Sequence, residues 1–222
     1  MTRKVAYLGP RGTFSEEAAM VYDRESQLVS FSTIYAVGEA VRSRIVDEGV
    51  VPIENSLEGS VTHTLDLLIS QSGLSIRQEV VLPIDHYLMA SPGTRATDIK
   101  VIYSHPQALA QCRDFLERCF PNAQQMASLS TVAAVSDMSA SSLAAAAIAP
   151  GRAADLYEVD IIGRSIQDNS NNVTRFVILA NEDHPPTGKD KTSICFAFDE
   201  DAPGLLYEAL GEFAQRSINL VK

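Results

Sequence analysis

A polar loop that runs into an apolar strand carries the residue types in this 222-residue chain that are best suited to chemistry. Residues 168–172 are polar, and Thr174, Arg175 and Phe176 then open an apolar run that continues to Leu179. A buried hydroxyl or guanidinium without a partner costs free energy, so Thr174 and Arg175 must pair with something or face a ligand. The alternative for this segment alone is an edge strand with a solvated arginine.

Three other segments have the pattern of a strand, a turn and a helix. Their turns are residues 9–15, 54–60 and 104–107. Thr13 with Glu16 has the spacing of a capping box, as has the third turn, and Asn55 with Glu58 has a spacing that fits a helix N-cap. We expect the three junctions to lie at one edge of a parallel sheet, where free backbone N–H groups bind anions.

The composition excludes several classes of partner. The formal net charge of −10 and the acidic pI near 4.8 argue against binding to nucleic acid or to an anionic membrane surface. An anionic ligand must then be attracted by helix dipoles and by particular arginines, for which Arg11 and Arg175 are the candidates. For Arg11 a solvated surface position is an equally good interpretation.

The motifs of metal, nucleotide and covalent serine chemistry are absent from the sequence. Cys112, Cys119 and Cys195 have no CxxC spacing, the four histidines form no HxxxH pair, and no GxSxG, GxxxxGK or GxGxxG occurs. We therefore expect reduced core thiols, no metal and no cofactor. The sequence begins without an apolar leader and contains no long apolar span, which predicts a soluble cytoplasmic protein.

Two segments are expected to connect two lobes. Residues 75–90 read as a long strand that leaves the first lobe, and residues 169–179 bring the chain back from the second. The third junction and the alanine-rich residues 141–149 would belong to the second lobe. Two crossings predict a hinged cleft. His86, in the first crossing, is expected to be a strand residue with a hydrogen-bonded ring.

Four motifs in matching order resemble the prephenate dehydratase family. They are Gly-Pro-Arg-Gly-Thr-Phe-Ser at 9–15, Val-Pro-Ile-Glu-Asn-Ser at 51–56, Tyr-Ser-His-Pro-Gln at 103–107 and Asn-Val-Thr-Arg-Phe at 172–176. The resemblance implies an α/β catalytic module over residues 1–184, with two lobes similar to type II periplasmic binding proteins. Lobe 1 would span about 1–82 and 165–184, lobe 2 about 83–164, and the active site would lie in the cleft between them.

The resemblance also implies a reaction and its residues. Prephenate would lose carbon dioxide and water to give phenylpyruvate, with the electrons of the carbon–carboxylate bond expelling hydroxide. No metal, nucleophile or redox cofactor is needed for this, only a positioned donor for the departing oxygen. The resemblance assigns catalysis to Thr174, Asn55, Ser104 and Gln111. It assigns substrate binding to Thr13, Ser15, Ser56, Asn172, Arg175 and Phe176.

Several of these assignments have alternatives. Gln107 lies one helical turn from Gln111 and shares its face, although the family pattern favours Gln111. Ser15 and Ser56 are equally well explained as helix-start residues. Strand alternation places Arg175 on the face opposite Thr174 and Phe176, so Arg175 could hold a neighbouring acid instead of substrate. Phe176 is expected to form an apolar wall beside the ring carboxylate, because poor solvation favours carboxylate loss.

Residues 188–222 resemble an incomplete ACT regulatory domain. We expect a strand over 192–198, a turn over 199–203, a helix with an apolar stripe from Leu205 to Phe213, and a strand over 218–221. This is about half of the βαββαβ pattern. Gly204 and Leu205 match half of the phenylalanine effector site, and the Glu-Ser-Arg-Pro motif is absent. We therefore expect feedback inhibition to be lost, and an uncovered apolar helix face to favour dimerisation, swapping or disorder.

Two other functions are compatible with the sequence. Arogenate dehydratase differs only in a substrate that carries an amino group where prephenate has a keto group. A non-catalytic small-anion-binding protein of the same fold would explain the three junctions but would not require Thr174 at the start of a strand. The predicted partner is a small-molecule substrate, with assembly as a homodimer or homotetramer.

Overall fold

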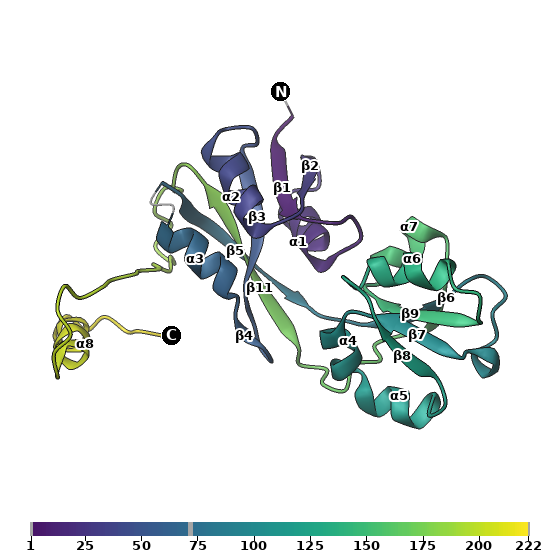
Figure 1. Ribbon diagram of the computed structural model, residues 1–222. Helices are drawn as coiled ribbons and strands as arrows, with labels where there is room; N and C mark the ends of the chain where they lie inside the picture. Colours follow the sequence, from purple (N-terminus) through teal and green to yellow (C-terminus); the bar gives the residue numbers. More distant parts are fainter. Residues whose placement is uncertain (1, 71–72, 222) are drawn as a thin grey trace. The chain divides into compact units, whose positions relative to one another are not determined.

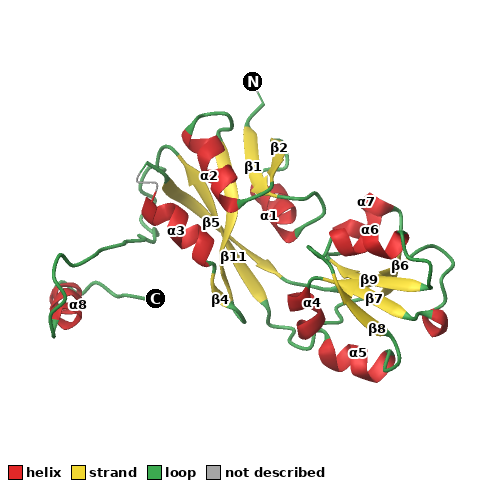
Figure 2. Ribbon diagram, viewed as in Figure 1, coloured by secondary structure: helices red, strands yellow, loops and turns green. Residues whose placement is uncertain are grey.

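The computed structural model describes residues 2–70 and 73–221 and divides the chain into two compact units, Met1–Pro185 and Pro186–Lys222. The first unit contains two β-sheets with helices on both faces of each (Figures 1 and 2). The second unit contains a single helix within its described residues. A mixed α/β fold with two sheets in the larger unit confirms the two-lobed organisation expected from the sequence.

The first sheet combines the N-terminal strands with a strand that returns late in the chain. Its strands in spatial order are β2 (Gln27–Phe31), β1 (Lys4–Leu8), β3 (Glu48–Asn55), β11 (Val173–Ala180) and β5 (Ser75–Pro83), with the short β4 (Gly59–Ser60) paired to β3. Strands β1, β2 and β3 run parallel, whereas β11 is antiparallel to both of its neighbours. The end of β3 and the beginning of β11 therefore meet side by side.

Helices cover both faces of this sheet because its strands are apolar on both sides. Helix α1 (Phe14–Tyr22) packs on the core cluster that contains Phe176 and Ile178 of β11. Helices α2 (Ile34–Arg42) and α3 (Thr62–Ser70) pack on the opposite cluster, which contains Val177 and Leu179. The alternation along β11 thus divides successive side chains between two separate cores, as the strand period requires.

The second sheet lies between the two crossings. Its strands in spatial order are β10 (Asp160–Gly163), β6 (Tyr87–Ala90), β9 (Ala145–Ala149), β7 (Val101–Ser104) and β8 (Gln124–Ala127). One face packs against α4 (Pro106–Gln111) and α5 (Arg113–Cys119), and the other against α6 (Ala133–Ser139) and α7 (Arg152–Tyr157). A short 3₁₀ turn, η1, spans Ala96–Asp98. The alanine-rich β9 is buried along its whole length at the centre of this sheet.

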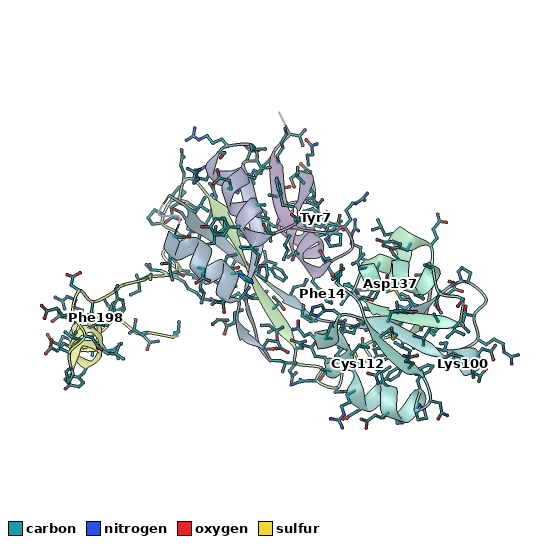
Figure 3. All side chains as sticks on the ribbon, viewed as in Figure 1. Tyr7, Phe14, Lys100, Cys112, Asp137 and Phe198 are labelled. Carbon is teal, nitrogen blue, oxygen red and sulfur yellow. The ribbon has the colours of Figure 1, made fainter. Side chains whose placement is uncertain are left out.

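Three local expectations were wrong. Both sheets are mixed, and the three strand-to-helix junctions are divided between them, two in the first and one in the second. The expected strand over 75–90 is interrupted between β5 and β6, because the chain changes sheets at residues 84–86. Of the three cysteines only Cys112 lies in the core, at the start of α5, where Figure 3 labels it, while Cys119 and Cys195 are exposed.

The smaller unit matches the sequence prediction in its helix and not in its strands. Helix α8 (Leu205–Gln215) begins after Gly204, whose φ of 99° is in the left-handed region that glycine tolerates. The described residues 192–198 and 218–221 form no strand. A strand needs hydrogen bonds from a neighbouring strand, and the described part of this unit supplies none. No helix among the described residues is long and apolar enough to cross a membrane.

Candidate functional site

Asn55 and Thr174 face each other where β3 ends and β11 begins. The two residues are register partners in the antiparallel pair, and Asn55 Nδ2 donates a hydrogen bond of 2.9 Å to Thr174 Oγ1. Both residues are 8% exposed. Among the described residues the Thr174 hydroxyl only accepts, so its own proton stays available for another acceptor.

The backbone fixes the orientation of the Asn55 amide. Its Oδ1 accepts hydrogen bonds from the N–H groups of Leu57 at 2.9 Å and Glu58 at 3.1 Å. These contacts hold a turn after β3, so Asn55 caps a turn and not the helix α3, which begins only at Thr62. Because the oxygen must face the two backbone donors, Nδ2 must face Thr174 and the Oδ1 of Asn172, which lies 2.7 Å away.

Asn172 and Gln111 connect this pair to the second sheet. Asn172 Nδ2 donates to Gln111 Oε1 at 3.1 Å, although Gln111 ends helix α4 beside the other sheet. His86 Nε2 lies 2.9 Å from the same Gln111 oxygen. The ring of His86 makes an edge contact with the ring of Phe14, with centroids 5.8 Å apart, and Figure 3 labels Phe14 next to the segments that join the sheets. The ring of His86 is hydrogen bonded as expected, but it lies between β5 and β6.

Two buried nitrogen atoms of this cluster lack a hydrogen-bond partner within the described structure. They are Nε2 of Gln111 and Nδ1 of His86. Burial lowers the pKa of His86, and the hydrogen bond with Gln111 and the charge of Asp85 only partly oppose this effect. His86 is therefore held in its neutral form, with one ring nitrogen available as an acceptor.

Ser56 fastens the loop before β11. Its hydroxyl accepts from the backbone N–H of Val173 at 3.0 Å and lies 3.4 Å from the carbonyl of Asn171, and its own N–H donates to the carbonyl of Val173 at 2.9 Å. The Ser56 hydroxyl is thus already engaged with the backbone. Its placement supports a structural task for Ser56 more directly than contact with a carboxylate.

Arg175 and Phe176 lie next to the cluster but point elsewhere. The guanidinium of Arg175 forms ion pairs with Glu54 of β3 at 3.1 Å and Glu79 of β5 at 3.3 Å. This geometry supports the alternative in which Arg175 holds neighbouring acids. Phe176 is 2% exposed and packs in the core under α1. The expected apolar wall beside a ligand does not fit this position, because the ring is covered by protein.

Ser104, Thr13 and Ser15 have no hydrogen bond to this cluster among the described residues. The fully buried Ser104 hydroxyl donates to the carbonyl of Ile148 at 2.7 Å and joins β7 to β9. The Thr13 hydroxyl caps α1 by accepting from the Glu16 N–H at 3.4 Å. Ser15 is buried in the first turn of α1. The family resemblance assigned ten residues to catalysis or substrate binding. Hydrogen bonds connect five of them in one place, namely Asn55, Asn172, Thr174, Gln111 and Ser56.

The sequence did not indicate the charge cluster around Glu16. This residue is 3% exposed, and its carboxylate accepts from the Gly12 N–H at 2.7 Å, from Arg152 Nε at 2.8 Å and from the Tyr7 hydroxyl at 3.3 Å. Burial alone would raise the pKa of Glu16, but the hydrogen bonds from Arg152 and Gly12 outweigh it and lower the pKa. Burial, followed by the Glu16 charge, raises the pKa of Tyr7 to about 12. Arg152 begins α7, so this pair joins elements on the two sheets.

Two cavities adjoin this charge cluster, with volumes of about 420 and 390 Å³. Both are lined by Met20, Arg24 and Arg152, and neither is lined by Thr174, Asn55 or Gln111. The larger cavity is lined by ionisable groups such as Glu17, Asp85 and Asp155. The hydrogen-bonded set of Thr174, Asn55, Asn172, Gln111 and His86, which we call the hydroxyl–amide cluster, instead contains a hydroxyl whose proton has no acceptor among the described residues. We take the hydroxyl–amide cluster as the candidate active site.

A family model described as prephenate dehydratase matches residues 5–184. The chain belongs to the prephenate dehydratase family. The bifunctional chorismate mutase/prephenate dehydratase of Aquifex aeolicus is 41% identical over 99% of this chain and 60% of that protein. The arogenate dehydratase/prephenate dehydratase 1, chloroplastic, of Arabidopsis thaliana is 42% identical over 99% of this chain and 56% of that protein.

Solved structures of the prephenate dehydratase family have the same fold. The prephenate dehydratase from Arthrobacter aurescens, described in complex with L-Phe, has a TM-score of 0.85 and 32% identity. The match covers 99% of this chain and 74% of that one. The chain described here spans 60% of the length of the Aquifex relative and 56% of the length of the Arabidopsis relative.

Proposed function

We propose that this chain converts prephenate into phenylpyruvate, carbon dioxide and water, as a lyase of phenylalanine biosynthesis. The family assignment supports this activity, and the Asn55–Thr174 pair is the observation on which it depends. A hydroxyl whose oxygen is held by an amide and whose proton has no described acceptor can donate to a departing oxygen.

The reaction needs a positioned donor more than a strong acid. As the carbon–carboxylate bond breaks, its electron pair enters the ring and the carbon–oxygen bond on the other side of the ring breaks. Hydroxide leaves as water with a proton that comes ultimately from solvent, and the ring becomes aromatic. A threonine hydroxyl is a weak acid, so we assign Thr174 the stabilisation of negative charge on the leaving oxygen and the relay of a proton to it.

The other residues receive supporting roles. Gln111 Nε2 would donate to an acceptor oxygen of the substrate, because this buried nitrogen has no partner within the described protein. Asn55 would orient Thr174, and Asn172 would orient Gln111. Thr13, Ser15 and Ser104 would contact substrate carboxylates only if the substrate reaches from the hydroxyl–amide cluster to the start of α1 or the end of β7. For Ser56, Arg175 and Phe176 we propose structural tasks.

Arogenate is the second candidate substrate. The Arabidopsis relative and one from Petunia hybrida, named arogenate dehydratase 2, are both 42% identical to this chain. Arogenate carries an amino group where prephenate has a keto group, and the described cluster contains no group that separates the two. A non-catalytic small-anion-binding protein is the third alternative, and it predicts binding without turnover.

We also propose a domain organisation. Residues 1–184 would form the catalytic domain and residues 188–222 part of an ACT-like regulatory domain, with Gly204 and Leu205 near a phenylalanine effector. We propose a cytoplasmic location and a homodimer or homotetramer. The exposed apolar side chains of α8, such as Leu206 and Leu210, support self-association. Light scattering would give the oligomeric state, and assays with phenylalanine would show whether inhibition is lost.

The activity is tested with purified chain and each substrate in turn. Formation of the aromatic product from prephenate is expected for the wild type. Thr174→Val removes the hydroxyl at nearly constant volume and should lower kcat by about 100- to 1000-fold. Thr174→Ser keeps the hydroxyl and should retain most of the activity. Turnover of arogenate alone would select the second candidate, and binding of both substrates without product would select the third.

A further inference from the structure

The hydrogen bonds of the cluster have a direction that the backbone determines. Backbone N–H groups of Leu57 and Glu58 can only donate, so the Asn55 atom that they contact is its oxygen. The Asn55 nitrogen then donates to Asn172, and the contacted Asn172 atom must be its oxygen. Each amide in turn has one possible orientation.

The same reasoning continues to His86. Because the Asn172 oxygen accepts from Asn55, its nitrogen donates to Gln111, and the contacted Gln111 atom is its oxygen. The His86 Nε2 atom 2.9 Å from that oxygen must therefore carry a proton. In a neutral ring the proton is then absent from Nδ1. The backbone N–H groups of Leu57 and Glu58 thus determine, through three side-chain amides, which ring nitrogen of His86 carries the proton.

The geometry leaves the Gln111 amide no freedom to turn. Two donors, Asn172 Nδ2 and His86 Nε2, approach its oxygen at 3.1 and 2.9 Å. The terminal torsion of a glutamine is otherwise broad. With its oxygen held from two sides, Nε2 points in one direction, and this buried nitrogen has no partner in the described structure. An N–H donor held in this way is suited to a ligand oxygen.

We propose that His86 is a positioning residue that holds the Gln111 amide for the substrate by donating from Nε2. This role rests on the proposed function. His86 lies outside the four sequence motifs, and the comparisons did not indicate a role for it. The ring itself is held by burial, at 3% exposed, and by its edge contact with Phe14. His86 does not act as a general acid or base in this role, because its proton stays in the bond to Gln111.

Three substitutions separate the donor from the ring. His86→Phe keeps the aromatic contact with Phe14 and removes the donor, so kcat should fall about 10- to 100-fold. His86→Gln can place an amide N–H near the position of Nε2 and should retain kcat within about 3-fold of the wild type. His86→Asn is too short to do so and should resemble His86→Phe. An unchanged kcat in His86→Phe, or equal losses in all three variants at wild-type thermal stability, would overturn the role.

A double-mutant cycle tests whether His86 acts through Gln111. Gln111→Met removes the amide at similar volume, and in this background His86→Phe should have little further effect on kcat. Multiplicative losses would mean that the two residues act independently and would contradict the inference.

Nitrogen NMR of the histidine rings tests the hydrogen-bond direction without any substrate. A neutral ring protonated at Nε2 is expected for His86 in the wild type, and a ring protonated at Nδ1 would refute the assignment. This measurement also separates two failures. An inactive wild type would contradict the proposed function, whereas an active wild type with an insensitive His86 would contradict only the positioning role.

Discussion

Asn55 takes part in five hydrogen bonds, and together they explain why an amide is required at the end of β3. The oxygen must accept from two backbone donors, and the two N–H groups of the nitrogen are shared between three acceptors, Asn172 Oδ1, Thr174 Oγ1 and the carbonyl of Val173. No other side chain of this size offers an acceptor and a donor in that arrangement. The Thr174 oxygen therefore already accepts a hydrogen bond from Asn55, whereas the hydroxyl proton has no acceptor among the described residues.

Asn55→Asp should therefore remove activity at nearly constant shape. A carboxylate can still accept from the backbone N–H groups of Leu57 and Glu58, but it cannot donate to Thr174. The Thr174 hydroxyl would instead rotate and donate to the carboxylate, so its proton would no longer be available to substrate. We expect kcat to fall about 100- to 1000-fold with a smaller change in KM, measured by product formation from prephenate.

Asn171→Asp is the matched control for this substitution. Asn171 is a loop neighbour of the cluster, with an exposed side chain, and the change introduces the same group and the same charge. Its kcat should stay close to that of the wild type. If both variants lost activity to the same extent, the added charge and not the lost donor would be the cause.

Single residues of the candidate site could be predicted from the sequence where a polar side chain interrupts or ends an apolar segment. Thr174 and Asn55 are polar residues at the ends of apolar strands, and a buried polar group must have a partner. Glu16 and Arg152 gave no such signal, because a glutamate in the first turn of one helix and an arginine at the start of another are ordinary surface residues. The capping-box spacing explained Glu16 locally, whereas its carboxylate accepts from Gly12 and from a distant arginine.

At the scale of elements, the helix pair α2 and α3 shows how tightly one face of the first sheet is covered. Gly38 lies in the middle of α2, where a Cβ would be 2.7 and 2.8 Å from the two methyl carbons of Leu67 in α3. Leu67 is fully buried, and close packing of a protein interior restricts how far such a side chain can move. The absence of a side chain at Gly38 therefore sets how closely the two helices approach.

Gly38→Ala should destabilise the protein although alanine is the better helix former. The gain in helix propensity is about 1 kcal/mol, whereas overpacking of a buried contact costs about 1–3 kcal/mol. We expect a net loss of up to about 2 kcal/mol in the free energy of unfolding, measured by urea denaturation. Leu67→Val shortens the opposing side chain, so the double variant should lose less than the sum of the two single variants. A more stable Gly38→Ala variant would mean that α3 moves freely away.

Elements were predicted well where a pattern was local and poorly where it depended on a partner. The helix at Leu205–Gln215 follows from its apolar stripe alone. The strands expected over 192–198 and 218–221 did not form, because a strand is stable only beside another strand. The interruption between β5 and β6 was missed for a related reason, since the change of sheet depends on which strands each half pairs with and not on the apolar pattern.

At the scale of the whole larger unit, a few polar contacts join the two sheets. The Gln111–Asn172 bond is one, and the ion pair of Glu16 with Arg152 is another. Arg152 is one-third exposed, whereas the Glu16 side chain is almost fully buried. Removing Arg152 would leave a buried carboxylate with weaker compensation, which is more harmful than the loss of an exposed pair.

Arg152→Met should lower the free energy of unfolding by about 1–3 kcal/mol near neutral pH, because Tyr7 and Gly12 still donate to Glu16. Arg113→Met removes an exposed ion pair of similar length, 2.7 Å against 2.8 Å, and should have little effect on stability because solvent screens it. The pKa of Glu16 is lowered in the folded protein, so its contribution is present above its ordinary pKa of 4.5 and is lost as the pH falls through the folded-state value. The difference between wild type and Arg152→Met should therefore shrink in denaturation experiments as the pH falls below 4.5. A difference that stayed constant with pH would show that Arg152 stabilises the unit through packing of its side chain and not through the charge of Glu16.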